Sequence, residues 1–308
     1  MVFLLFMKKI NFFSLLIVAV FYSVGQSACA FLEFRQTDEE LTRYFTQKKL
    51  RAVIHRYRTA EGRTIRHLSV GADSMPTVVV IHGAPSSLST AIGVLSDSVL
   101  LGVARTVGVD RAGYGYSDFG WGETSIQRQS EILVPLLDSL KQQSGGQPLV
   151  LMGVSYGGPI AAWLAARYPD LINGLVLAAP AIEPGAETVY DISYPMRWWL
   201  TGWLFPANLR VATDEKFAHK EELTQMLPLW ERIKIPVIYV QGMDDEVVNP
   251  SNAEFAKRML KNAASLDVVM IPNQKHFLSV PQRELLVDVL IRMVERVKKR
   301  TWQHKASF

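Results

Sequence analysis

One stretch of the sequence, residues 149–166, most limits what the chain can fold into. It runs from Leu-Val-Leu-Met through Gly-Val-Ser-Tyr-Gly-Gly into an alanine-rich segment. The first part is typical of a buried strand and the last part of a helix, so Ser155 would lie in the sharp turn between them. Gly153 and Gly157 complete the pattern Gly-x-Ser-x-Gly, in which small residues permit the tight turn. The stretch therefore predicts an α/β protein with a serine hydroxyl beside a helix N-terminus, where a developing oxyanion is favoured.

Composition narrows the class of protein. The chain has 308 residues, of which 49% are hydrophobic and 20% charged, as expected for a globular domain with a large core. A net charge of +4, without a basic run interleaved with aromatic residues, argues against nucleic acid as a partner. No metal-ligand spacing and no glycine-rich phosphate loop is present, so we predict no metal and no cofactor.

Residues 1–30 are predicted to be an export signal that is removed from the mature chain. They are mostly apolar with two lysines, and the apolar run is shorter than a membrane span needs. Translation from Met7 would give a cleaner signal. Residues 28–30 form an Ala-x-Ala cleavage site, whereas Cys29 resembles the acylated cysteine of a lipobox, from which Gln26 departs. We expect an exported protein, periplasmic or membrane-anchored through this segment or a lipid on Cys29, the single cysteine of the chain.

Alternating strands and helices predict a doubly wound sheet. Continuous apolar runs such as Thr77–Ile81 are typical of strands buried on both faces. We expect about eight strands in a mostly parallel sheet, because repeated β and α units favour that topology. The expected strands are 51–57, 63–70, 77–81, 105–109, 149–154, 175–177, 236–241 and 266–271. The expected helices are 31–49, 88–101, 124–143, 157–168, 215–231, 252–262 and 281–298.

An acid and a histidine follow Ser155 in the order that a catalytic triad needs. Asp244, Asp245 and Glu246 all follow the seventh expected strand, and we favour Asp245. His276 follows the eighth strand, where it could accept a proton from the serine. Glu183 is an alternative acid.

The segment after the third expected strand, His82-Gly-Ala-Pro, supplies a second oxyanion donor. The N–H of Ala84 would act together with the N–H of Tyr156, the residue after the serine. His82 itself is interpreted as structural, with catalysis as the alternative.

Taken together, these motifs resemble the α/β-hydrolase superfamily. The resemblance covers roughly residues 50 to 300 and implies that Ser155, Asp245 and His276 form the triad. It also implies a core of residues 31–180 and 235–308, with residues 181–234 inserted after the sixth strand as a helical cap. A serine at position 155 argues against epoxide hydrolases and haloalkane dehalogenases, which use aspartate. The motifs are His82-Gly-x-Pro, Asp110-x-x-Gly-x-Gly-x-Ser117, Gly-x-Ser155-x-Gly, Gly242-x-x-Asp245 and His276.

The expected cap is rich in aromatic residues. Trp198, Trp199 and Trp203 are candidates for binding an apolar part of a substrate, and Trp199 and Trp203 are one helical turn apart. The same residues could instead pack the cap onto the core or lie at a membrane interface.

These observations predict a serine hydrolase that cleaves a small-molecule carboxylic ester through an acyl-enzyme. Hydrolysis of an amide or an aminoacyl ester is the alternative reaction. Two further hypotheses for the function remain. The chain could be a hydrolase-like binding protein that catalyses no reaction, or a surface-anchored interaction protein whose cap faces lipid.

Overall fold

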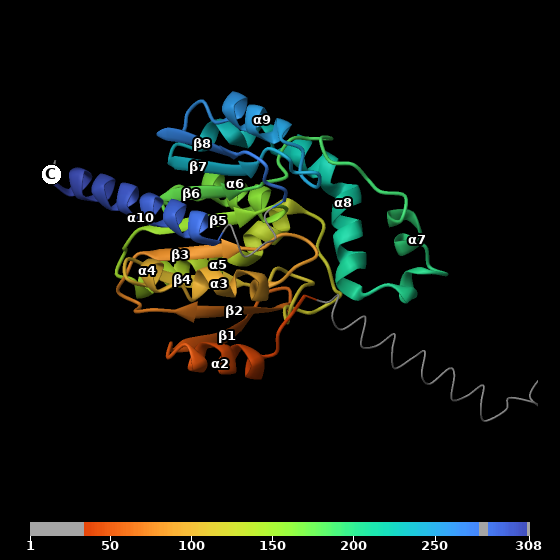
Figure 1. Ribbon diagram of the computed structural model, residues 1–308, viewed down its shortest axis with the longest axis horizontal. Helices are drawn as coiled ribbons and strands as arrows, with labels where there is room; N and C mark the ends of the chain where they lie inside the picture. Colours follow the sequence, from red (N-terminus) through yellow and green to blue (C-terminus); the bar gives the residue numbers. More distant parts are fainter. Residues whose placement is uncertain (1–33, 277–282, 307–308) are drawn as a thin grey trace, which may run out of the picture.

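An eight-stranded sheet forms the centre of the computed structural model, which describes residues 34–276 and 283–306 (Figure 1). The strand order is β1-β2-β4-β3-β5-β6-β7-β8, and pairing is parallel from β4 through β8, with β1 and β2 antiparallel at one side. The predicted fold, a mostly parallel doubly wound sheet of about eight strands, is therefore confirmed. The strands are β1 (Ala52–Arg58), β2 (Thr64–Val70), β3 (Thr77–Ile81), β4 (Arg105–Val109), β5 (Leu149–Val154), β6 (Gly174–Ala178), β7 (Pro236–Gly242) and β8 (Ser265–Ile271).

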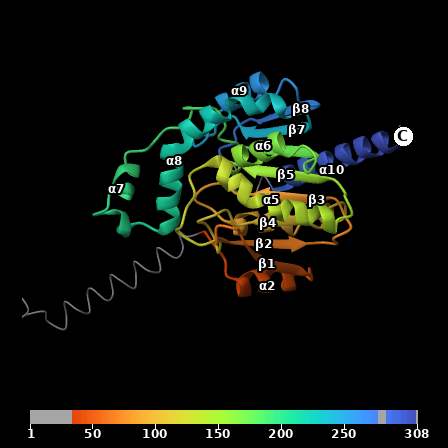
Figure 2. The ribbon, with the colours of Figure 1, turned by 180° about the vertical axis from the view of Figure 1, so that it is seen from behind.

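Helices cover both faces of the sheet, as the two opposite views show (Figures 1 and 2). One face carries α5 (Ile126–Gln143), α6 (Gly157–Arg167) and α9 (Ser251–Met259). The other carries α3 (Ile92–Leu95), α4 (Ser98–Leu101) and α10 (Arg283–Ala306), with α2 (Asp38–Gln47) below β1. The sheet therefore separates two hydrophobic cores.

The alternation of side chains in β3 explains its uninterrupted apolar sequence. Val79 and Ile81 lie in the core beneath α5 and α6, whereas Val78 and Val80 lie in the core beneath α10. All five residues of the strand are buried. Because each face is covered by helices, every position of the strand favours an apolar side chain.

A helical insertion separates β6 from β7, as the sequence predicts. It contains α7 (Ser193–Arg197), α8 (Ala207–Met226) and the short 3-10 helices η2 (Gly202–Leu204) and η3 (Leu227–Arg232). In both ribbon views α8 stands between the sheet and α7, which is the outermost part of the insertion (Figures 1 and 2).

Several helix boundaries differ from the sequence-based expectations. The helix expected at 88–101 is divided into η1 (Leu88–Ala91), α3 and α4, because the Asp97 side chain accepts hydrogen bonds from Val99 and Leu100 N–H and starts a new helix. The helix expected at 215–231 begins eight residues earlier, after Pro206, and ends as η3.

The predicted export signal, residues 1–30 with Cys29, lies outside the described residues. Within the described residues, no helix combines the length and the hydropathy needed to cross a membrane.

Candidate active site

The turn between β5 and α6 holds Ser155 in a strained conformation. Its φ is +51°, in the left-handed region that non-glycine residues rarely adopt. Ser155 N–H donates to the carbonyl of Ala178 at 3.0 Å, and Gly158 N–H donates to the carbonyl of Ser155 at 2.9 Å. A Cβ at Gly157 would lie 2.8 Å from the His82 carbonyl oxygen, so only glycine fits there. These contacts fix Ser155 at the carboxyl edge of the sheet.

Asp245 and His276 lie in the loops that follow the two neighbouring strands β7 and β8. Oδ2 of Asp245 is 2.8 Å from Nδ1 of His276. The other carboxylate oxygen accepts hydrogen bonds from Val247 N–H at 2.9 Å and Val248 N–H at 2.8 Å. Burial raises the pKa of the Asp245 carboxyl, but the hydrogen bonds from His276 and the backbone outweigh it, so the pKa lies below 3.8. The carboxylate is therefore held ionised beside the imidazole.

The other candidate acids have different contacts. Asp244 and Glu246 are exposed, and Glu246 pairs with Lys275 at 3.3 Å. Glu183 pairs with Arg258 at 2.9 Å and also contacts the hydroxyl of Ser251. Among these four carboxylates, Asp245 is the one that the structure brings to the histidine.

The loop after β3 touches the serine. A Cβ placed on Gly83 would lie 2.8 Å from Cβ and 3.4 Å from Oγ of Ser155. Ala84 directly follows Gly83, and Tyr156 directly follows Ser155. The two backbone N–H groups predicted to bind an oxyanion therefore belong to segments that meet at the serine hydroxyl.

Both ring nitrogens of His82 are engaged beneath this loop. Arg111 N–H donates to Nε2 at 3.0 Å, so the proton lies on Nδ1, which donates to the carbonyl of Gly83 at 2.7 Å. Burial and the charge of Arg111 hold the pKa of His82 well below 6.5. These contacts are those of a structural residue, in agreement with the interpretation of His82 from the sequence.

A buried ion pair joins the cap helix α8 to the loop after β4. Arg111 Nη1 lies 2.5 Å from Glu215 Oε1, and both side chains are at most 1% exposed. The hydroxyl of Tyr114 and the amide of Gln129 also donate to the Glu215 carboxylate, at 2.6 and 3.0 Å. Arg111 Nε donates in turn to the His82 carbonyl at 3.0 Å. A continuous polar network thus links the cap to the segment that precedes Gly83.

Sequence reasoning missed this network. Arg111 and Glu215 are 104 positions apart, and nothing in the sequence near either residue points to the other. Glu215 lies among other charged residues, including Lys216 and Lys220, so its sequence surroundings did not single it out as the buried carboxylate.

His219 of α8 lies over the residue that follows the serine. Its ring is 5.0 Å from the Tyr156 ring, and Nε2 is 3.1 Å from the carbonyl oxygen of Ala181. Burial and the nearby charge of Lys216 lower the pKa of His219 from 6.5 to about 4. At neutral pH this histidine is uncharged.

This low pKa predicts that acid weakens the folded state. The unfolded chain binds a proton at His219 below about pH 6.5, whereas the folded chain does so only below about pH 4, so the free energy of unfolding falls between these values. His219→Gln keeps a donor for Ala181 without a titrating group. We expect urea unfolding at pH 7 and pH 4.5 to show a smaller loss of stability in this variant than in the unaltered chain. Equal losses in both proteins would contradict the assignment.

The three tryptophans predicted to bind substrate lie in the outer part of the cap. They line a cavity of about 340 Å³ together with the loop 120–124 and residues of α8. Ser155, Asp245 and His276 do not line it. Trp198, Trp199 and Trp203 are 53%, 80% and 73% exposed.

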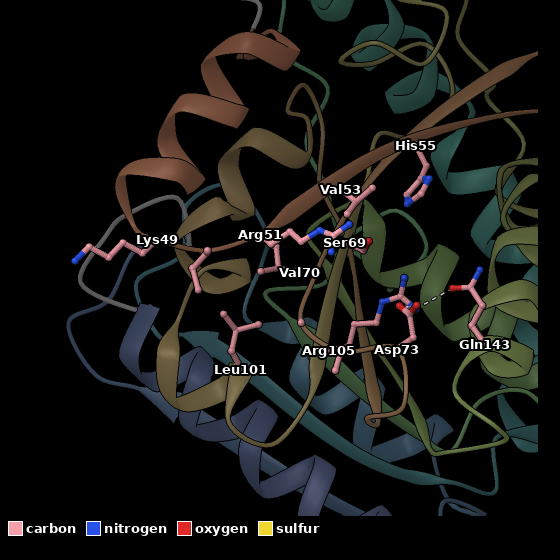
Figure 3. A pocket seen from close by; sticks show the side chains of 13 residues that line it. Lys49, Arg51, Val53, His55, Ser69, Val70, Asp73, Leu101, Arg105 and Gln143 are labelled. Atoms are coloured by element: carbon pink, nitrogen blue, oxygen red, sulfur yellow. Dashed lines mark hydrogen bonds and ion pairs between the residues drawn. The ribbon is translucent and has the colours of Figure 1, made fainter.

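A second cavity, of about 790 Å³, lies at the opposite edge of the sheet (Figure 3). Arg105, the first residue of β4, is located there between Asp73 at 3.0 Å and Gln143 at 2.9 Å. The remaining lining residues come mainly from β1 and the three residues before it, and from the end of β2 and the two residues after it. This cavity is therefore remote from Ser155.

Comparison with known proteins agrees with the fold. The model of the alpha/beta hydrolase fold family matches residues 76–208. Esterase Rv0045c of Mycobacterium tuberculosis is 37% identical over 108 residues, which are 34% of this chain and 33% of the esterase. A haloalkane dehalogenase of Bradyrhizobium diazoefficiens is 30% identical over 114 residues, which are 37% of this chain and 35% of the dehalogenase. The chain thus spans about a third of the length of these two curated relatives.

A solved structure resembles nearly the whole chain. The crystal structure of a bacterial membrane phospholipase A superposes with a TM-score of 0.62 and 22% identity, over 93% of this chain and 96% of the phospholipase. At a sequence identity of 22%, this similarity is evidence for a shared fold alone. The sheet order, the cap position and the match to the family model together show that the chain has the α/β-hydrolase fold.

Proposed function

We propose that this protein is a serine hydrolase that cleaves carboxylic esters through an acyl-enzyme. The observation that carries the proposal is the 2.8 Å contact between Asp245 and His276, at the same sheet edge where Ser155 is held at a φ of +51°. A carboxylate that accepts the Nδ1 proton keeps Nε2 of the imidazole as the basic nitrogen. The similarity to an esterase supports an ester as the substrate.

In the proposed reaction Ser155 Oγ attacks the carbonyl carbon while His276 Nε2 takes the hydroxyl proton. The negative charge that develops on the carbonyl oxygen is stabilised by the N–H groups of Ala84 and Tyr156. His276 then gives the proton to the departing alkoxide, which leaves as the alcohol. Water, deprotonated by His276, releases the acid from the acylated serine.

The acyl part of the ester is proposed to be apolar. Trp198, Trp199 and Trp203 offer aromatic surface in the cap, and indole rings bind apolar groups well. Residues 1–30 support the further proposal that the enzyme acts outside the cytoplasm, because their composition is that of an export signal.

Asp245→Asn tests the proposed triad. An asparagine keeps the shape of the side chain but favours the wrong imidazole tautomer, and in a serine protease such a change lowers kcat by about 10⁴-fold. We expect a loss of about 10³- to 10⁴-fold in the hydrolysis of short-chain p-nitrophenyl esters. The matched control is Asp244→Asn, which changes the exposed neighbouring carboxylate and should retain nearly full turnover. If both variants lost activity equally, or if the unaltered protein hydrolysed no ester, lactone or aminoacyl amide, the proposal would fail.

A further inference from the structure

The outer part of the cap exposes an unusual amount of apolar surface. Residues 190–204, here named the aromatic arm, include α7 and η2. The folded part of a globular protein rarely leaves so many large apolar side chains together in water, and such patches mark interaction sites. Eight side chains of the arm are between 45% and 80% exposed: Tyr190, Ile192, Tyr194, Trp198, Trp199, Leu200, Trp203 and Leu204.

The arm is an ordered segment rather than a loose loop. Arg197 pairs with Asp214 of α8 at 3.0 Å, and the Tyr194 ring meets the Phe217 ring edge-on at 5.3 Å. Within the arm, Thr201 donates to the carbonyl of Pro195 at 2.6 Å. One side of the arm therefore packs against α8, and the other side faces away from the sheet (Figures 1 and 2).

Exposed apolar side chains are concentrated at one end of the molecule. Of the fourteen large hydrophobic residues that are exposed in the described part of the chain, only Val53 and Val99 lie outside the cap and the carboxyl edge of the sheet. Phe34 and Trp121, with Met243 and Val247 in the loop that holds Asp245, are also exposed at this edge. The asymmetry gives the molecule one apolar end, next to Ser155.

The composition of the arm fits a lipid bilayer. Tryptophan and tyrosine, with an apolar ring and one polar group, are the residues enriched at the level of the lipid headgroups. The arm contains three tryptophans and two tyrosines, together with isoleucine and leucine residues that could reach deeper into the bilayer. Its only charged residues are Asp191 and Arg197, and Arg197 is paired. Contact with the bilayer would therefore rest on apolar burial rather than on attraction to anionic lipids.

The start of the described chain lies beside the cap. The Phe34 carbonyl accepts a hydrogen bond from Ser87 at 2.6 Å, and Pro85 in the same loop accepts one from Asn208 of α8 at 3.0 Å. The described chain therefore begins at the end of the molecule that carries the arm. An anchor formed by the residues that precede it would hold the arm close to the membrane.

We infer that the aromatic arm docks on the surface of a lipid bilayer, with its indole rings at the headgroup level. Docking in this orientation turns the carboxyl edge of the sheet, and with it Ser155, toward the lipid. The inference does not depend on the proposed chemistry, because exposure of the arm is a property of the fold.

Tryptophan fluorescence of the full chain in phosphatidylcholine vesicles tests the inference. Vesicles whose lipids carry bromine near the top of the acyl chains quench only indoles that enter the interface. We expect strong quenching of the unaltered protein and loss of most of it when Trp198, Trp199 and Trp203 are replaced by phenylalanine. The control is Trp163→Phe, which removes a buried indole of α6 and should keep the quenching.

Several outcomes would overturn docking by the arm. One is that the unaltered protein cosediments with both kinds of vesicle but shows the same tryptophan fluorescence in brominated as in unbrominated vesicles. Another is quenching that survives in the triple variant. A third is protection of the arm from acrylamide in buffer without lipid, together with a dimeric mass, which would assign the surface to a second copy of the chain. Should the triple variant fail to fold, Trp199→Phe alone, at the most exposed indole, should still reduce the quenching measurably.

Discussion

Ser155→Ala is expected to abolish ester hydrolysis and all labelling by a fluorophosphonate probe. Without the hydroxyl no acyl-enzyme can form, and loss of the nucleophile in a serine protease lowers kcat by about 10⁶-fold. The side chain is buried and alanine occupies less space, so the fold should tolerate the change. The measurement is turnover of p-nitrophenyl esters together with probe labelling, with the thermal unfolding temperature as the check on folding.

The matched control is Ser117→Ala. Ser117 is also buried, but its hydroxyl accepts a hydrogen bond from Arg66 N–H at 2.8 Å in the loop after β4. We expect this variant to be labelled by the probe. Labelling that persisted in Ser155→Ala would assign the nucleophile to another residue, whereas an unlabelled but folded parent protein would favour a hydrolase-like binding protein.

Glu215→Ala is expected to destabilise the fold strongly. Removing the carboxylate leaves the Arg111 guanidinium buried without its counter-charge, and breaking a buried ion pair in this way costs about 3–5 kcal/mol. For a domain of this size the unfolding temperature should fall by on the order of 10 °C. Thermal unfolding followed by circular dichroism measures the shift.

Two further variants separate the ion pair from general damage to α8. Glu221→Ala removes an exposed carboxylate of the same helix that accepts a hydrogen bond from Gln225, and it should change stability by less than about 0.5 kcal/mol. Replacing both Arg111 and Glu215 by apolar residues of similar size should recover part of the loss, because no charge then remains buried. Equal shifts for Glu215→Ala and Glu221→Ala would contradict the role assigned to the pair.

The sheet could be predicted because each parallel strand is buried on both faces. Val78–Ile81 is apolar at every position for that reason, and the same holds for the strand before Ser155. Order along the chain was enough to propose Ser155 and His276. Among the three adjacent acidic residues it favoured Asp245 but left Asp244 and Glu246 open, because the choice depends on the backbone turn that directs Asp245 inward and leaves Asp244 exposed.

The sequence predicted the second half of the cap helix but not its start, for a specific physical reason. The buried face of α8 includes Asn208, Thr213, Glu215 and His219 beside apolar residues, so no continuous apolar stripe at helical spacing marks where the helix begins. Three of these polar groups are buried against loops that are distant in the sequence. Asn208 donates to Pro85, Glu215 pairs with Arg111 and His219 contacts Ala181. Partners of that kind are visible only once the chain is folded.

The attachment of α8 has a consequence for how the cap can move. Four side chains of this helix bind the segments that follow three different strands, β3, β4 and β6, so lifting the helix would separate a desolvated pair of charges and several hydrogen bonds at once. The four are Asn208, Glu215, His219 and Glu222. The stretch before it is held by the solvent-exposed pair of Arg197 and Asp214. Lifting α8 therefore costs far more free energy than shifting residues 190–204, so any movement of the cap is expected first in its outer part.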